Sequence, residues 1–94
     1  MKKRLSITIT DMIKSDQELF EAFYGCLQFP DWFGFNWSAL WDSLNDFQWD
    51  EDIEHVDINI KAWPSLPDDG VGIFKSMMHD LDYSMVTVHF PDTA

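Results

Sequence analysis

Apolar and polar residues alternate in three short segments of this chain. The segments 5–10, 56–61 and 85–90 each place an apolar side chain at every second position, with polar residues between them. A period of two is typical of a strand that buries one face and exposes the other. We therefore predict three half-buried strands.

Three other segments repeat apolar residues at spacings of three and four, which predicts helices. Ser15 followed by Glu18 forms a capping box at the start of the first helix, which cannot extend past Pro30. Gly34 is expected to allow a tight turn, and Asn36 to cap the second helix. The third helix is expected over 71–82. The predicted buried stripes are Leu19, Phe20, Phe23 and Leu27; Trp37, Leu40, Trp41 and Leu44; and Phe74, Met77, Met78 and Leu81.

The order of these elements predicts the fold class. Strand–helix–helix–strand–helix–strand calls for parallel strands joined by crossovers. A parallel sheet covered on both faces would show continuous apolar runs, whereas all three predicted strands alternate. We therefore predict an α/β, two-layer fold with a three-stranded parallel sheet and helices packed on one face. At this length the chain is expected to form a single domain over residues 1–94.

Residues 29–49, FPDWFGFNWSALWDSLNDFQW, combine aromatic and acidic side chains. Eight of these 21 residues are aromatic and none is Lys or Arg. A small domain can bury only some of these rings, and rigid aromatics among carboxylates suit a surface that a basic, concave partner covers. On the second helix, Ser38, Asp42, Asn45 and Asp46 form a polar stripe. The alternative is an aromatic-rich core helix with an acidic solvent face, and composition alone does not decide between the two.

The net charge narrows the choice of partner. Seventeen acidic residues against six Lys and Arg give −11 at pH 7, and eleven of the acids lie between Lys14 and Lys61, where no Lys or Arg occurs. Nucleic acids and anionic membranes attract basic proteins, so neither is an expected partner. The charge instead favours a basic protein partner and rapid association.

Catalytic, metal and redox motifs are not expected here. The single Cys26 allows no internal disulfide or CxxC motif, and its position in the first helix predicts a buried side chain. The three histidines lack metal-ligand spacing. Asp42 and Asp46, one helical turn apart, could mimic a glycosidase pair, but such pairs are usually a solvated face. No phosphate-binding loop or nucleophile motif occurs, so we expect neither an enzyme nor a cofactor.

The first residues also bear on localisation. Met1–Arg4 is basic like the start of a signal peptide, but the alternating segment that follows provides no apolar h-region. No run approaches membrane-spanning length. The sequence therefore predicts a cytoplasmic protein.

The loop and second helix resemble the barstar family of intracellular inhibitors of secreted bacterial ribonucleases. The resemblance lies in P-x-[aromatic]-[aromatic]-G-x-N followed by A-L-W-D-x-L, within residues 29–47. Family members plug the ribonuclease active site with this helix and loop, and their acidic groups occupy phosphate positions. The resemblance implies that Trp32 stacks at the catalytic centre and that Asp42 enters the phosphate subsite. The full set of predicted contact residues is Trp32, Phe33, Phe35, Asn36, Trp37, Ser38, Trp41, Asp42, Asn45, Asp46 and Ser76.

The chain departs from the family pattern at several of these positions. Ser38 stands where the type inhibitor has a second Asp, and Ser76 where it has a Glu on the third helix. Phe35 and Trp37 are bulky side chains where the type inhibitor has smaller or polar ones. The resemblance thus implies an immunity protein that forms a 1:1 complex with a basic toxin other than the ribonuclease of the type inhibitor. We expect this toxin also to be a ribonuclease. The alternative function is a generic acidic protein–protein interaction module without an inhibitory role.

Overall fold

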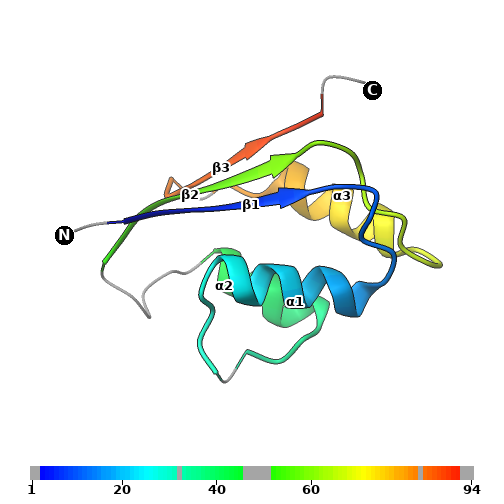
Figure 1. The fold of residues 1–94 in the computed structure, drawn as a ribbon, viewed down its shortest axis with the longest axis horizontal. Coiled ribbons are helices and arrows are strands. Elements are labelled where there is room, and N and C mark those ends of the chain that lie inside the picture. The colour runs from blue at the N-terminus through cyan, green and yellow to red at the C-terminus, as the bar shows by residue number, and fades with distance from the viewer. Residues whose placement is uncertain (1–2, 32, 46–51, 83, 92–94) are drawn as a thin grey trace.

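The structure is a computed structural model that describes residues 3–31, 33–45, 52–82 and 84–91. Strands β1 (Lys3–Ile9), β2 (Ile53–Ile60) and β3 (Val86–His89) form one sheet in the order β1-β2-β3. Both neighbouring pairs are parallel. Helices α1 (Asp16–Cys26), α2 (Trp37–Leu44) and α3 (Gly70–Asp80) all lie on one side of this sheet (Figure 1). The predicted two-layer α/β fold and its element order are confirmed.

The core lies between the sheet and the helix layer. Every second side chain of β1 enters it, and Ile9 is fully buried. The register places Ile7 opposite Ile58 and Ile58 opposite Val88, so the apolar positions of the three strands line up on one face. Phe23 of α1 and Phe74 of α3 meet edge-on beneath this face, with ring centroids 6.1 Å apart. The alternation read from the sequence therefore marks the buried face of the sheet.

The start of α1 follows the predicted capping box. The hydroxyl of Ser15 accepts a hydrogen bond from the Glu18 N–H at 3.1 Å, and the Glu18 carboxylate accepts one from the Lys14 N–H at 3.3 Å. The first bond satisfies a donor that a helix N-terminus otherwise leaves unpaired, and the second ties Glu18 back to the residue before the N-cap, where a capping box would use the N–H of the N-cap itself. The helix ends at Cys26, well before Pro30, and Gln28 then takes a left-handed backbone conformation with φ 56°.

Gly34 serves a purpose other than the predicted one. Its φ is not positive, so the turn does not require the conformational freedom of glycine. A Cβ at this position would lie 3.2 Å from Nδ2 of Asn36, so the glycine instead lets the Asn36 side chain approach the loop backbone.

The prediction of a buried Cys26 is wrong. Its side chain is exposed, whereas Leu27, the next residue, is fully buried. Cys26 is the last residue of α1, and the helix turns it toward solvent while the chain that follows turns inward.

The third helix and the last strand are slightly displaced from their predicted bounds. α3 begins at Gly70 and ends at Asp80, because Leu81 already has an extended backbone. Phe90, expected on the inner face of the last strand, follows β3 and is 42% exposed. None of the helices in the described part of the chain has the length and apolar character needed to span a bilayer.

Candidate protein-binding surface

The loop between α1 and α2 is built on aromatic rings that pack against one another in tilted and edge-on arrangements. Phe33 lies 4.9 Å from Phe29 and 5.1 Å from Phe35, measured between ring centroids. Tyr24 of α1 contacts the same group, 5.3 Å from Phe35. Phe33 is only 3% exposed, whereas Phe35 is 39% exposed. Of these two predicted contact residues, Phe35 faces solvent and Phe33 supports it from the core.

One hydrogen bond ties this loop to α1, and a second closes a turn within the loop. The Tyr24 hydroxyl donates to Oδ1 of Asp31 at 3.0 Å, and the Phe33 N–H donates to the Pro30 carbonyl at 2.9 Å. The bond to Asp31 raises the pKa of the Tyr24 phenol above its ordinary value of 10.0, because ionisation would lose the donated proton and place a second negative charge beside the carboxylate. Trp32, which the sequence places in this loop, lies outside the described residues.

Two asparagines set the ends of α2. Oδ1 of Asn36 accepts a hydrogen bond from the Ala39 N–H at 2.8 Å, as the predicted N-cap requires. At the other end, the Asn45 side-chain amide donates to the Trp41 carbonyl at 2.8 Å. An N-cap such as Asn36 commonly stabilises a helix by about 1 kcal/mol. Because both amides bind the helix itself, only their remaining donors and acceptors are available to a partner.

The two faces of α2 separate the core from solvent. Leu40 and Leu44 are fully buried, while Ser38 and Asp42 are exposed. Trp37 is half-buried and packs edge-on against Phe20 of α1, with ring centroids 5.0 Å apart. The expected inward stripe is thus fully buried at its two leucines and only partly at its tryptophans. Asp46, the last member of the expected polar stripe, lies outside the described residues.

Asp42 lies where its charge does not help the fold. It belongs to the last turn of α2, the negative end of the helix dipole, where a carboxylate is unfavourable. Within the described parts of the chain, no Lys, Arg or His is paired with it. Its carboxylate is exposed, and so it is free to meet a cation from another molecule.

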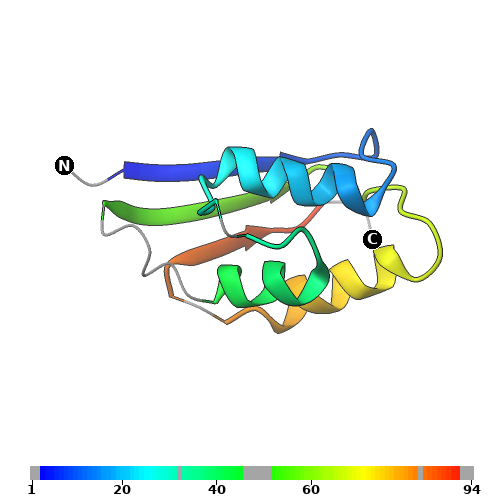
Figure 2. The same cartoon turned by 90° about the horizontal axis from the view of Figure 1, so that it is seen from below.

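A groove between α2 and α3 brings together two predicted contact residues that are distant in the sequence. Trp41 of α2 and Ser76 of α3 both line it. The two helices run beside each other when the molecule is seen from the helix side (Figure 2). We refer to this feature as the α2–α3 groove; its further lining residues are Asp68, Asp69, Gly72, Ile73, Met77 and Asp80.

Most of the α2–α3 groove is not among the contact residues predicted from the sequence. The positions 69, 72, 73, 76 and 80 follow a helical spacing of three and four, which indicates one face of α3. This spacing could have been used to predict that these residues lie on one face of the third helix. The sequence did not indicate that Trp41 of another helix would form the opposite wall.

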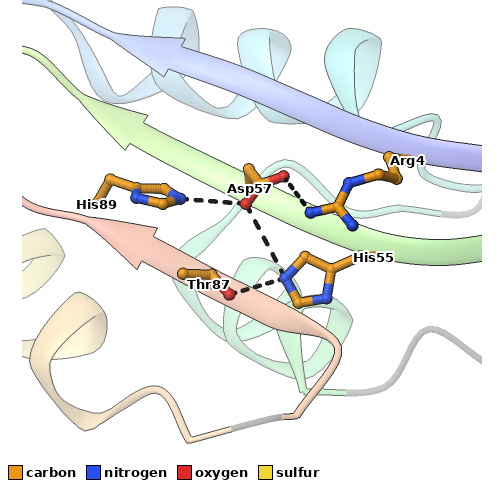
Figure 3. A network of polar contacts seen from close by, with 5 residues as sticks. All are labelled: Arg4, His55, Asp57, Thr87 and His89. Carbon is orange, nitrogen blue, oxygen red and sulfur yellow. Dashed lines mark hydrogen bonds and ion pairs between the residues drawn. The ribbon is translucent and has the colours of Figure 1, made fainter.

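The open face of the sheet carries a separate polar cluster (Figure 3). Oδ1 of Asp57 accepts a hydrogen bond from Nε2 of His89 at 3.1 Å, and Oδ2 accepts one from Nη2 of Arg4 at 3.3 Å. Nε2 of His55 lies 4.0 Å from the same carboxylate and 2.7 Å from Oγ1 of Thr87. The strand register thus gathers two histidines that are far apart in sequence. Within the described ranges, no set of His, Cys, Asp and Glu could hold a metal ion.

The Asp57 cluster gives a prediction on acid stability. The hydrogen bond from His89, helped by Arg4, lowers the pKa of the Asp57 carboxyl below its ordinary value of 3.8. A group with a lowered pKa in the folded state stabilises the fold above its unfolded pKa, and this contribution is lost as pH falls through the folded pKa. Asp57→Asn should therefore lower the free energy of unfolding by about 0.5–1 kcal/mol at pH 7.

Urea denaturation at pH 7 and near pH 3 measures this effect. The gap between Asp57→Asn and the unaltered chain should shrink on the acid side. Glu54→Gln, at an exposed position of the same strand, is the control and should cost less at pH 7. A gap for Asp57→Asn that is equal at both pH values would contradict the linkage.

Comparison with known protein families matches most of this architecture, up to the segment before β3. The family model described as barstar (barnase inhibitor) matches residues 6–82, which include all three helices, β2 and most of β1. No curated protein matched the chain.

Proposed function

We propose that this chain, which belongs to the barstar family, inhibits a bacterial ribonuclease toxin by covering its active site with α2 and the loop before it. Proteins of this family are inhibitors rather than enzymes, and they bind ribonucleases such as barnase. The observation that carries the proposal is Asp42, an exposed carboxylate on α2 next to Trp41 in the sequence, with which no Lys, Arg or His of the described residues is paired.

The chemistry of a ribonuclease cleft explains why such a surface would fit. The cleft binds RNA phosphates with cationic side chains, and a carboxylate can take the place of a phosphate there. In the proposed complex Asp42 is that carboxylate, and Phe35 and Trp41 exclude water around it. Charge pairs that are desolvated in this way, with aromatic anchors beside them, are typical binding hot spots.

The two serines among the predicted contacts favour a toxin other than barnase. Ser38 and Ser76 are both exposed, and hydroxyl groups there offer hydrogen bonds but no charge. The chain would therefore present fewer charges at its contact surface than the family pattern does. We propose a basic cognate toxin whose cleft is less cationic, bound in a 1:1 complex without a cofactor, in the cytoplasm of the cell that the chain protects.

The remaining predicted contacts complete the proposed surface. Asn36 and Trp37 lie at the start of α2, and Asn45 lies at its end. Trp32 and Asp46 lie outside the described residues, and we include them in the proposed surface because of the family resemblance alone. Phe33 is assigned a supporting role because it is buried.

Growth of cells that produce a toxic ribonuclease domain tests the proposed function. The candidate toxins are barnase and the domain encoded beside the gene of this chain. Co-production of the chain should restore growth with the cognate toxin. Growth that is never restored, together with stable complexes with several non-toxic proteins, would favour the alternative of an acidic interaction module.

The rate of association should depend on salt. The segment from Asp42 to Asp57 contains seven acidic residues, counting both of its ends, and their negative field should guide a basic cleft toward α2. We expect the association rate constant to fall by about tenfold or more between low salt and about 0.5 M salt, with a smaller change in dissociation. Stopped-flow mixing with the toxin measures both constants. An association rate that does not respond to ionic strength would contradict electrostatic steering.

A further inference from the structure

We propose that Tyr24 of α1 is a positioning residue for toxin binding. Through its ring, and through the hydrogen bond from its hydroxyl to Asp31, it fixes Phe35 in the place from which Phe35 meets the toxin. This inference rests on the proposed function and deepens it. Neither Tyr24 nor Asp31 is among the contact residues that the family resemblance implies.

Tyr24 meets the loop between α1 and α2 at four points. Its carbonyl accepts a hydrogen bond from the Phe29 N–H at 3.2 Å, and its hydroxyl donates to Oδ1 of Asp31 at 3.0 Å. Its ring stacks on Phe33 with centroids 6.3 Å apart, and it packs at a tilt against Phe35 at 5.3 Å. One helical residue is thus joined to the start, the middle and the end of the loop.

The Phe35 ring needs such support because it is 39% exposed and lies outside both helices. Two rings of the described residues contact it, Phe33 at 5.1 Å and Tyr24 at 5.3 Å between centroids. Phe33 belongs to the loop itself, whereas Tyr24 belongs to α1 and follows Phe23, which is fully buried in the core. The helix therefore gives Tyr24 a fixed place from which to hold the loop.

A held ring binds more tightly than one that must be ordered by the partner. Immobilising a side chain on association costs affinity, and a surface that is already in its bound conformation avoids this cost. The hydroxyl of Tyr24 adds to the effect, because a hydrogen bond to a carboxylate is stronger than one between neutral groups. It fixes Asp31, which lies in the same loop as Phe35.

Three variants separate positioning from general stability. Tyr24→Leu removes the ring and the hydroxyl, and Tyr24→Phe removes the hydroxyl alone. Trp63→Leu is the matched control, because Trp63 is also a half-buried aromatic residue packed against the core, with its ring centroid 5.9 Å from that of Phe74. Trp63 is not part of the proposed surface. Urea denaturation of the variants shows how much stability each substitution removes.

The first measurement uses the free chain and needs no toxin. The ¹⁵N relaxation of the Gly34 and Phe35 amides reports how well the loop is ordered. In Tyr24→Leu their order parameters should fall from the range of rigid backbone, about 0.85, toward that of flexible segments, below about 0.6. Trp63→Leu should leave them unchanged. Order parameters that stay the same in Tyr24→Leu would overturn the inference.

The second measurement is the affinity for the toxin that the chain inhibits in the growth test. Tyr24→Leu should weaken binding by about three- to tenfold, and Tyr24→Phe by less, because it keeps the ring. Trp63→Leu should stay within about twofold. In a chain that already carries Phe35→Ala, Tyr24→Leu should weaken binding by less than about twofold, since the ring that it positions is absent.

The double variant distinguishes positioning from a loss of structure. A general loss of structure would weaken binding equally with and without Phe35→Ala, and that result would overturn the inference. Unchanged binding by Tyr24→Leu would also overturn it and leave the proposed function standing. Failure of the unaltered chain to bind any ribonuclease would refute the proposed function, and this inference with it.

Discussion

Asp42→Ala is expected to weaken toxin binding by at least about 2 kcal/mol, or about thirtyfold. In the proposed complex the Asp42 carboxylate pairs with a cation in the ribonuclease cleft. Its removal leaves that cation desolvated and unpaired, which is the main cost of breaking a buried charge pair. Because Ser38 and Ser76 carry no charge, no other predicted contact in the described part of the chain could take over its role. We claim only the magnitude common to interface hot spots.

The same substitution should leave folding almost unchanged. Asp42 is exposed and lies at the negative end of α2, and alanine is the best helix former. The free energy of unfolding should stay within about 0.5 kcal/mol of the original value or rise slightly.

Calorimetric titration gives the affinity, and urea denaturation gives the stability. Asp11→Ala, which removes one exposed acid outside the proposed surface, is the charge-matched control and should change affinity far less. Asp46→Ala should have an intermediate effect. If Asp42→Ala binds as well as the unaltered chain, the partner uses a different surface, and the family membership describes the fold but not the site.

Leu44→Ala should have the opposite pattern, with a loss of about 2–5 kcal/mol in the free energy of unfolding. The Leu44 side chain is fully buried on the inner face of α2, so truncation leaves a cavity that the surrounding core fills only in part. Any loss of binding should match the fraction of molecules that unfold.

Ser38→Ala is the matched control for Leu44→Ala. It lies on the exposed face of the same helix and should change stability by less than about 0.5 kcal/mol. A loss below about 1 kcal/mol for Leu44→Ala would mean that α2 is not packed as the structure shows, and would remove the basis for separating its two faces.

The sequence was most informative where a local pattern alone determines the structure. Alternation over 5–10 identified β1, and Ser15 with Glu18 located the start of α1, because a strand face and a capping box are each defined by neighbouring residues. The prediction that Cys26 is buried was wrong because Cys26 is the last residue of α1, where the helical spacing of buried positions no longer applies. In the loop, Phe33 and Phe35 look equivalent in sequence, and only the packing of Tyr24 and Phe29 shows which ring is buried.

Features that join distant segments could not be predicted in the same way. The α2–α3 groove depends on Trp41 meeting a helix that begins 29 residues later, at Gly70. The Asp57 cluster depends on the register that places Asp57 opposite Thr87 on β3. The spacing of His55 and His89 in the sequence contains no sign of it.

The most direct test of active-site occlusion is a titration of ribonuclease activity with the purified chain. Toxin held well above its dissociation constant should lose activity linearly and reach zero at one equivalent, with no metal or nucleotide added. A substrate analogue bound in the cleft should slow the inhibition in proportion to its occupancy. Residual activity at saturation, a need for large excess, or inhibition that the analogue does not affect would contradict occlusion of the active site.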